Sequence, residues 1–237
     1  KIQKTKLNKN IISWITNIKK LKKIPSIFIA NEFFDSLAIK QFSKKKNLWF
    51  EKFVHLENNK EAYFFEKKFN MKNYEKKINF KLSKNQKFIE YSETGIDYLK
   101  KISDIIKINT GGILIIDYGY SNIKMKNTLQ SISRHRYSNI LKNIGDSDIT
   151  HNISFGLFKK IIKNLNGLKD NLTTQKEFLI KMGIYERAEI ISRNQSFLKK
   201  ADIYYRLKRL VDDKQMGKLF KVMFATNKKN KFSMGFK

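Results

Sequence analysis

Three short segments of the chain carry the side chains that could do chemistry. The first, residues 31–35, reads Asn-Glu-Phe-Phe-Asp and directly follows an apolar run. Its two carboxylates, Glu32 and Asp35, could hold a cation or grip a guanidinium through forked, charge-assisted hydrogen bonds. The structural alternative is a polar strand-to-helix junction in which Asp35 only caps the helix. On physical grounds alone the two interpretations are even.

The second segment, residues 117–120, reads Asp-Tyr-Gly-Tyr and follows Gly111-Gly112 and four apolar residues. Asp117 could hold a partner loop, a metal or a substrate amine. The alternative is a turn that ends a strand, with glycine at positive φ. Taken alone, this segment favours the turn.

The third segment comprises residues 133–137, with Arg134 and His135, and residues 148–151, which end in His151. Histidine, aspartate and arginine together could form an acid-base site or an anion clamp. Isolated histidines are more often structural, and the spacing matches no known metal-binding pattern. We therefore predict no metal site, and on spacing alone we favour a structural role.

The elements around these segments indicate how they are positioned. Residues 24–30 form a continuous apolar run flanked by turns, which is typical of a parallel strand buried on both faces. Residues 92–107 have helical spacing, with Ser92 as a possible cap. Residues 113–116 predict a second buried strand. Since ligands bind outside the carboxyl ends of parallel strands, we expect residues 31–35 and 117–120 to share one crevice.

The rest of the chain predicts a mixture of short elements. We expect a single domain over residues 1–237, with a hairpin-and-loop insertion at 39–87 and a loop-plus-helical region at 121–215. Within it, the pattern predicts a strand at 11–15, a β-hairpin over 39–56 and 60–66, a loop at 67–87, a short strand at 87–91, a long loop with a short helix at 121–152, helices at 154–165, 174–182, 184–193 and 195–212, and a strand at 218–225.

The composition limits the function classes. The net charge of +29 would attract polyanions. However, only six of the 50 basic residues are arginine, whose planar fork is favoured for recognising phosphates and bases. We therefore expect no specific nucleic-acid partner. The chain has no cysteine, no apolar run near the roughly 18 residues of a membrane span, and no G-x-G-x-x-G loop.

Six blocks, in this order between about residues 11 and 225, carry a resemblance to a known family: IFIANEFFDSLAIKQF, GGILIIDYGY, TLQSISRHRY, DSDITHNISF, LTTQKEFLIKMGI and MGKLFKVM. Together they resemble the MidA family, whose eukaryotic members are the mitochondrial complex I assembly methyltransferases. The resemblance implies an α/β fold of the Rossmann-like class I type, with a seven-stranded sheet whose last strand is antiparallel. It also implies S-adenosyl-L-methionine (SAM) as methyl donor and an arginine of a partner protein, a core subunit of complex I, as acceptor.

With SAM as donor and arginine as acceptor, the positions of the three segments predict roles for their residues. Glu32 and Asp35 would grip the acceptor guanidinium, with Arg134 also on the substrate side. Asn31 would line the SAM side, and Asp117 and Tyr118 would face the same cleft. His135 and His151, with Arg134, would close a loop over the cleft, and one of the two histidines would accept the late proton.

The chain departs from the family pattern in ways that give a structural expectation. Ala38 stands where the family has proline. The family's first two strands, with the glycine-rich SAM loop, would lie ahead of Lys1, so the strand at 24–30 should form an exposed apolar edge. The alternatives are a non-catalytic module that binds a partner or polyanion, and an RNA methyltransferase. We expect the cytoplasm for a bacterial protein and the mitochondrial matrix for a eukaryotic one, and we predict no particular oligomeric state.

Overall fold

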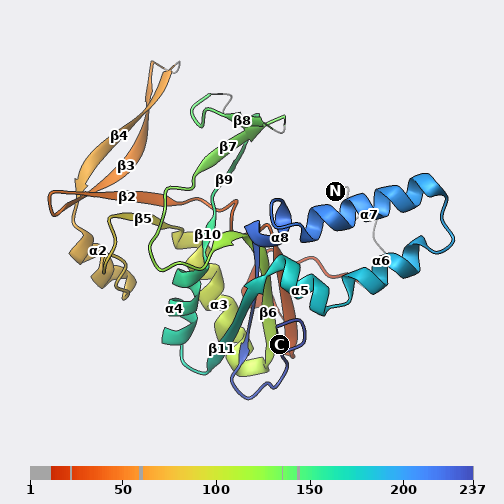
Figure 1. Ribbon diagram of the computed structural model, residues 1–237. Helices are drawn as coiled ribbons and strands as arrows, with labels where there is room; N and C mark the ends of the chain where they lie inside the picture. The colour runs from red at the N-terminus through yellow and green to blue at the C-terminus, as the bar shows by residue number, and fades with distance from the viewer. Residues whose placement is uncertain (1–11, 22, 59–60, 135, 143–144, 237) are drawn as a thin grey trace.

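The structure, a computed structural model, describes residues 12–21, 23–58, 61–134, 136–142 and 145–236. The strands form three sheets, and helices pack around the central one (Figure 1). The central sheet contains β1 (Ser26–Asn31), β6 (Gly111–Tyr120), β12 (Phe220–Asn227) and β11 (Leu168–Thr174), in this spatial order, with β10 (Ile153–Ser154) paired to β6. β1 and β6 are parallel, and the last strand, β12, is antiparallel to both of its neighbours, as the resemblance implies.

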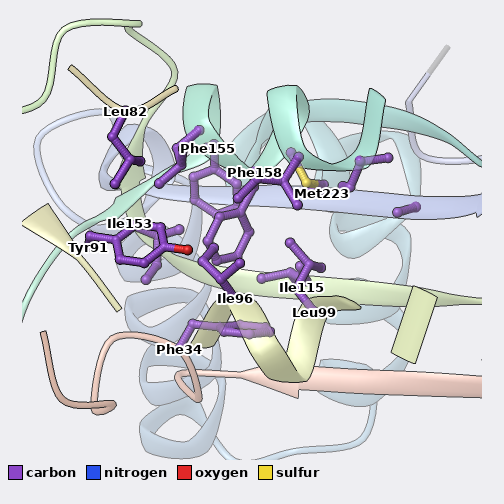
Figure 2. Close-up of a cluster of buried hydrophobic side chains, with 14 of the residues drawn as sticks. Phe34, Leu82, Tyr91, Ile96, Leu99, Ile115, Ile153, Phe155, Phe158 and Met223 are labelled. Atoms are coloured by element: carbon purple, nitrogen blue, oxygen red, sulfur yellow. The ribbon is translucent and has the colours of Figure 1, made fainter. Parts of the chain in front are cut away.

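One face of the central sheet is covered by α3 (Glu93–Asn109) and α4 (Phe155–Asn164). Ser92 caps α3 by accepting a hydrogen bond from the backbone N–H of Gly95, as predicted. The apolar stripe of α3 meets the β6 side chains that point to this face (Figure 2), and the shared core includes Ile96, Leu99, Ile113, Ile115, Phe158 and Met223. Apolar residues at helical and at alternating spacing thus build one core.

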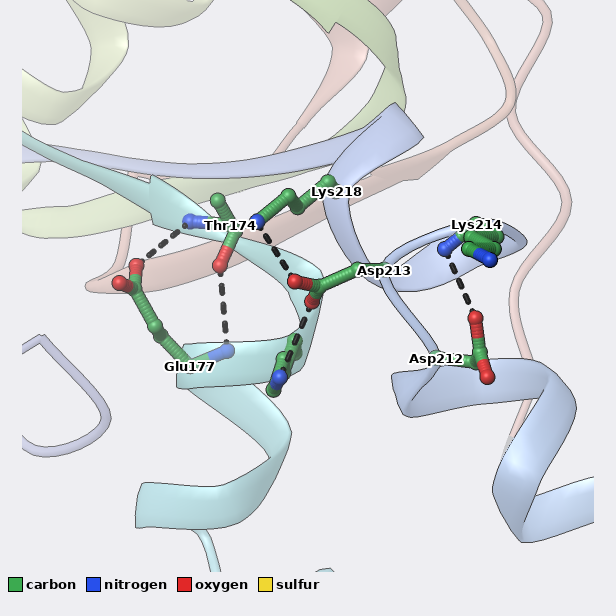
Figure 3. A network of polar contacts seen from close by, with 7 residues as sticks. Thr174, Glu177, Asp212, Asp213, Lys214 and Lys218 are labelled. Carbon is green, nitrogen blue, oxygen red and sulfur yellow. Dashed lines mark hydrogen bonds and ion pairs between the residues drawn. The ribbon is translucent and has the colours of Figure 1, made fainter.

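The opposite face carries α5 (Gln175–Lys181) and α8 (Met216–Leu219), which contact β11, β12 and β6. Between them, α6 (Ile184–Ser192) and α7 (Phe197–Val211) form a helical hairpin that projects from the body of the molecule (Figure 1). Thr174 and Glu177 form a reciprocal capping box at the start of α5, and Asp213 joins α8 to α5 through ion pairs with Lys218 and Lys176 (Figure 3). The predicted helices at 154–165, 174–182, 184–193 and 195–212 are confirmed.

β1 forms the predicted exposed apolar edge. In the described part of the chain it pairs only with β6. Ile27 and Ile29 point away from α3 and are 63% and 71% exposed. The expectation that this strand is buried on both faces is therefore wrong, because only the face that carries Phe28 and Ala30 packs against the core.

The second sheet consists of β4 (Glu61–Phe69), β3 (Leu48–Glu57), β2 (Lys40–Lys45) and β5 (Phe88–Tyr91), in this order and antiparallel throughout. β3 and β4 form a long ribbon that projects from the molecule (Figure 1). The predicted single hairpin thus contains an additional turn at Lys46-Asn47, both with positive φ. The loop predicted at 67–87 is wrong in part, since β4 continues to Phe69 and α2 (Met71–Ile78) follows.

The third sheet is small and consists of β8 (Arg136–Ser138), β7 (Gln130–Ser133) and β9 (Asp148–Thr150). The prediction of a loop with a short helix at 121–152 is therefore wrong in part: residues 121–129 form the expected loop, but three short strands, and no helix in the described residues, follow it. Buried Glu90 fixes the approach to this sheet: its carboxylate accepts hydrogen bonds from Gln41, from the backbone and hydroxyl of Thr128, and from the backbone of Leu129.

Two further differences concern the ends of the chain. Residues 12–15 form no strand, and the first described element is the short 3-10 helix η1 (Ile18–Lys20); Ile11, where the predicted strand begins, lies outside the described residues. The predicted last strand begins later than expected, because α8 takes residues 216–219. Over the residues that the structure describes, no helix has the length and apolar character needed to cross a bilayer.

Candidate active site

Two neighbouring parallel strands bring the first two candidate segments together. Asn31 ends β1 opposite Ile116 of β6, so residues 32–35 leave the sheet beside residues 117–120, which continue β6 beyond the predicted end of that strand. The backbone N–H of Glu32 donates to the carbonyl of Ile116 over 2.9 Å. Glu32 itself has φ of 46°, a left-handed conformation that costs a non-glycine residue about 1–2 kcal/mol. Such local strain is typical of functional sites, where the surrounding structure holds the residue in place.

Asp117 is the structural brace of this edge. The residue is 0% exposed. Its Oδ2 accepts hydrogen bonds from the backbone N–H groups of Phe34 and Asp35 at 3.2 and 3.3 Å, and its Oδ1 accepts from the N–H of Tyr118 at 2.9 Å. Burial, followed by the nearby charge of Asp35, raises the pKa of Asp117 to about 8. Asp117 therefore fixes the backbone turn that presents Glu32 and Asp35.

The aromatic residues between the two carboxylates anchor the same turn. Phe34 is buried and packs edge-to-face on Phe158 of α4, with ring centroids 5.1 Å apart (Figure 2). Phe33 packs edge-to-face on Tyr98 of α3, with centroids 5.5 Å apart. Aromatic pairs in this geometry stabilise beyond their buried area alone, and of these two pairs only Phe34–Phe158 is buried. The segment thus has its rings turned into the helices and its carboxylates turned towards the edge of the sheet.

Asp35 and His151 form the interior of the site. Asp35 is 3% exposed, and its Oδ1 has no hydrogen-bond partner in the structure. The backbone N–H of His151 donates to the carbonyl of Asp35 over 3.1 Å, and the Nε2 of this buried histidine also lacks a partner. Burial, and then the charge of Glu32, raise the pKa of Asp35, while His151 lowers it. Buried polar atoms without partners are costly, which points to a group that binds there.

Tyr118 connects the two strands at the mouth of the site. Its hydroxyl donates to the Glu32 carboxylate over 3.4 Å, and its ring packs on Phe220 with centroids 4.2 Å apart. Burial, with Glu32 as the next cause, raises the pKa of Tyr118 to about 12. The hydroxyl therefore remains protonated near neutral pH and can act as a hydrogen-bond donor.

These residues line a cleft of about 310 Å³. The lining comprises Glu32, Asp35, Ser36, Tyr118, Gln130, Ile132, Asp148, Ile149 and Thr150. Although the chain has 50 basic residues, the lining contains three carboxylates and no basic side chain. A larger hollow of about 610 Å³ lies at the base of the β3–β4 ribbon, but it is lined by lysines and by no acidic residue. The smaller cleft is therefore the one suited to a cationic ligand.

The structure brings only part of the predicted set together. Glu32, Asp35 and Tyr118 line the cleft, with Asp117 and His151 directly behind them. Asn31 and Arg134 are exposed and lie outside the lining, and His135 lies outside the described residues. The roles predicted for all of these residues remain predictions.

The wall opposite β1 comes from β7 and β9. Of its residues, Asp148 and Thr150 belong to the third candidate segment, whereas the sequence pattern assigns Gln130 and Ile132 only to a loop. The alternation of polar and apolar residues at 130–133 was the signal that could have indicated a strand.

Comparisons with known proteins identify the family and the fold of the chain. A family model described as "Putative S-adenosyl-L-methionine-dependent methyltransferase" matches residues 1–173. The chain is 24% identical to the mitochondrial protein arginine methyltransferase NDUFAF7 of Danio rerio over 91% of this chain and 51% of the relative. It is 27% identical to the Caenorhabditis elegans homolog over 78% of this chain and 43% of the relative. The chain therefore spans about half the length of these curated relatives.

Solved structures share the fold. A crystal structure of a Burkholderia thailandensis protein bound to S-adenosyl-homocysteine superposes with a TM-score of 0.72 at 20% identity, covering 95% of this chain and 57% of that chain. A native crystal structure from the same organism gives a TM-score of 0.73 at 19% identity, covering 92% of this chain and 59% of that chain.

Proposed function

Because this chain belongs to the family of SAM-dependent methyltransferases whose model its residues 1–173 match, we propose that its acidic cleft is where an arginine side chain of a partner protein is methylated. The observation that carries this proposal is the cleft itself. Glu32 and Asp35 face a space without basic residues, and the Oδ1 of Asp35 is buried and unpartnered. A guanidinium would supply both the missing charge and the missing donor.

The named relatives support the finer part of the proposal. Those compared above are protein arginine methyltransferases by name, and their names place them in mitochondria. We extend the acceptor class, an arginine of a protein, to the full protein that contains this chain. A mitochondrial location and a core subunit of complex I as acceptor would follow for a eukaryotic protein, and the cytoplasm for a bacterial one.

The carboxyl ends of β1 and β6 fit the sulfonium end of SAM, the cofactor of this family. A positive charge would be favoured beside the carboxylate of Glu32, which also accepts a hydrogen bond from the Tyr118 hydroxyl. The exposed amide of Asn31 is next to Glu32 in the chain, at the end of β1. In this proposal Asn31 and Tyr118 hold the cofactor side, and Asp117 contributes by fixing the turn between them. When bound, SAM supplies an electrophilic methyl group, whose transfer to a guanidinium nitrogen releases one proton.

The chain's own residues would do the rest by binding and proton handling. A guanidinium stays protonated in water and is a poor nucleophile. Glu32 and Asp35 would orient it and draw its charge towards the carboxylates, which leaves one nitrogen free to face the methyl group. The proton released would pass to Oδ1 of Asp35, whose pKa is raised by burial. His151, directly behind Asp35, would share that proton through its free Nε2.

The net charge of +29 favours RNA as the second candidate acceptor, because a strongly basic surface attracts polyanions. A nucleic-acid acceptor would have to place its phosphates beside three carboxylates in the cleft. The acidic lining therefore ranks protein arginine above RNA.

The product identifies the acceptor. The full-length protein would be incubated with SAM labelled in the methyl group and with extract from cells that lack the protein. After separation of protein from RNA and acid hydrolysis of the protein, we expect the label in methylarginine. Label in RNA nucleosides would instead support the second candidate. Absence of label from every fraction would support a non-catalytic binding module.

A further inference from the structure

The face of the small β8–β7–β9 sheet that borders the cleft has the features of a binding platform. Directly opposite residues on antiparallel strands point to the same face of a sheet. Ile132 of β7 lies opposite Tyr137 of β8 on one side and opposite Asp148 of β9 on the other. Ile132 and Asp148 line the cleft, so all three side chains stand on the cleft-facing side. We name this row, Tyr137, Ile132 and Asp148, the acceptor platform.

The row leads into the candidate active site. β9 is the strand nearest to the interior, because the His151 N–H that follows it donates to the carbonyl of Asp35 over 3.1 Å. β8 lies two strand spacings further out, about 10 Å from β9. The platform therefore runs from Tyr137, which is 80% exposed, through Ile132 to Asp148 and on to Asp35. Figure 1 shows this sheet beyond the β10 end of the central sheet.

Each position of the row offers a different contact. The aromatic ring of Tyr137 is largely exposed to solvent, and tyrosine is a residue type that often anchors interfaces. Ile132 continues this surface as a half-buried apolar residue. Asp148 adds a carboxylate at the point where the platform meets the cleft. The order of contacts is thus apolar, apolar and anionic, going inwards.

Two observations favour a cation as the group that binds at the inner end. The lining of the cleft has three carboxylates and no basic residue in a chain of net charge +29. In addition, Oδ1 of Asp35, nine-tenths buried and part of the same lining, has no hydrogen-bond partner. Charge and hydrogen-bonding capacity therefore point to the same class of ligand group, a guanidinium or ammonium.

On the basis of the proposed function, we propose that this platform binds the polypeptide segment that carries the acceptor arginine. An apolar side chain beside the arginine rests on Tyr137 and Ile132, and Asp148 selects the positive charge as it enters the cleft. Asp148 and Tyr137 are specificity-determining residues in this account, and neither handles the reacting atoms. Their loss should weaken binding of the acceptor and leave the turn held by Asp117 intact.

Binding of four peptides to the full-length protein tests the platform. The probes are Ac-Gly-Leu-Arg-Leu-Gly-NH2, its Gly-Gly-Arg-Gly-Gly counterpart, and citrulline analogues of both, titrated by NMR into ¹⁵N-labelled protein. We expect the arginine peptides to shift the amides of Ile132 and Asp148, and the neutral citrulline analogues to bind more weakly. D148N should weaken arginine-peptide binding about two- to fivefold, the range for a partly exposed charge pair. Y137A should abolish the advantage of the leucine-flanked peptide.

Matched controls separate these effects from general ones. D146N removes the same charge two residues away, outside the lining of the cleft, and Y205A removes an exposed tyrosine from α7. Both should bind like the wild type. Equal affinities for D148N and D146N, or equal binding of arginine and citrulline peptides, would overturn the platform.

Methylarginine formation, measured on the same preparations, separates this proposal from the proposed function. Intact methylation combined with an affinity that does not depend on Asp148 or Tyr137 would overturn only the platform. Arginine-dependent binding that follows Asp148 without any methylarginine would support the platform and count against the proposed function.

Discussion

Replacing Asp117 with alanine should release the turn that carries Glu32 and Asp35. Asp117 is fully buried and accepts three backbone hydrogen bonds, two from the turn and one from the N–H of Tyr118, the next residue of β6. Each such bond contributes about 1 kcal/mol to stability, and a buried donor left without a partner costs about that much or more. We therefore expect D117A to lower the free energy of unfolding by about 3 kcal/mol.

The asparagine variant refines the estimate. Asn at position 117 keeps one oxygen that can accept from Phe34 and Asp35, but its amide group faces the N–H of Tyr118. One of the three bonds is thus lost, and D117N should cost about 1–2 kcal/mol. The order of stability should be wild type, then D117N, then D117A.

Urea unfolding, followed by the fluorescence of buried Trp49 and by circular dichroism, measures these differences. D104A is the matched control, because Asp104 is an exposed carboxylate on α3 and should stay within about 0.5 kcal/mol of the wild type. Amide hydrogen exchange adds a local readout: the N–H groups of Phe34 and Asp35 should lose protection in D117A. A cost below about 1 kcal/mol for D117A, with unchanged protection of both amides, would refute the role of Asp117 as a brace.

Three further predictions concern pH, the second sheet and helix capping. Burial raises the pKa of Asp117 to about 8, so the unfolded chain loses this proton near pH 4 and the folded chain only near pH 8. The free energy of unfolding of the wild type should therefore fall between about pH 4 and about pH 8, and that of D117N should fall less. Equal pH dependence of the free energy of unfolding in the two proteins would contradict this. E90A removes an acceptor of four hydrogen bonds and should cost about 3 kcal/mol in urea unfolding, whereas the exposed control E57A should cost little. T174A breaks the capping box of α5 and should cost about 1 kcal/mol, with T174S restoring most of it; equal stability of T174A and T174S would show that the cap does not matter.

The sequence predicted the central part of the fold because its signals are strong and local. Four consecutive apolar residues at 113–116, the helical spacing after Ser92 and the polar residues that follow each strand give a parallel pair with one shared edge. The meeting of Glu32 with Asp117 and Tyr118 follows from that topology. The antiparallel last strand came from the family resemblance and could not be derived from spacing.

The missed elements are short and polar. β7 and β9 contain only four and three residues, mostly hydroxyl, amide or acidic, so their apolar signal is too weak to distinguish strand from loop. α2 has three lysines among its eight residues, and its only apolar side chains are those of Met71, Tyr74 and Ile78. β11 was missed for the same reason, since most of its residues are polar. These elements are held by contacts with the rest of the fold, which a local pattern does not show.

The candidate site was therefore predictable on one side only. The β1 and β6 side of the cleft follows from strand ends, but the opposite wall depends on β7 and β9. The role of Asp117 also needed coordinates, because its complete burial and its three backbone donors distinguish a brace from a ligand. Positive φ at Glu32 was equally invisible in the sequence.

The rate of methylarginine formation by an E32Q variant of the full-length protein, at saturating SAM, tests the paired-carboxylate grip most directly. Gln at position 32 keeps the size and a hydrogen-bonding oxygen but removes the charge that would orient the acceptor. We expect a rate at least about 100-fold below that of the wild type, because misplacing a reactant or removing one stabilising group costs about that factor. The exposed control E57Q should match the wild type. An E32Q rate within about threefold of the wild type, a difference below about 1 kcal/mol, would contradict the grip and with it the proposed site.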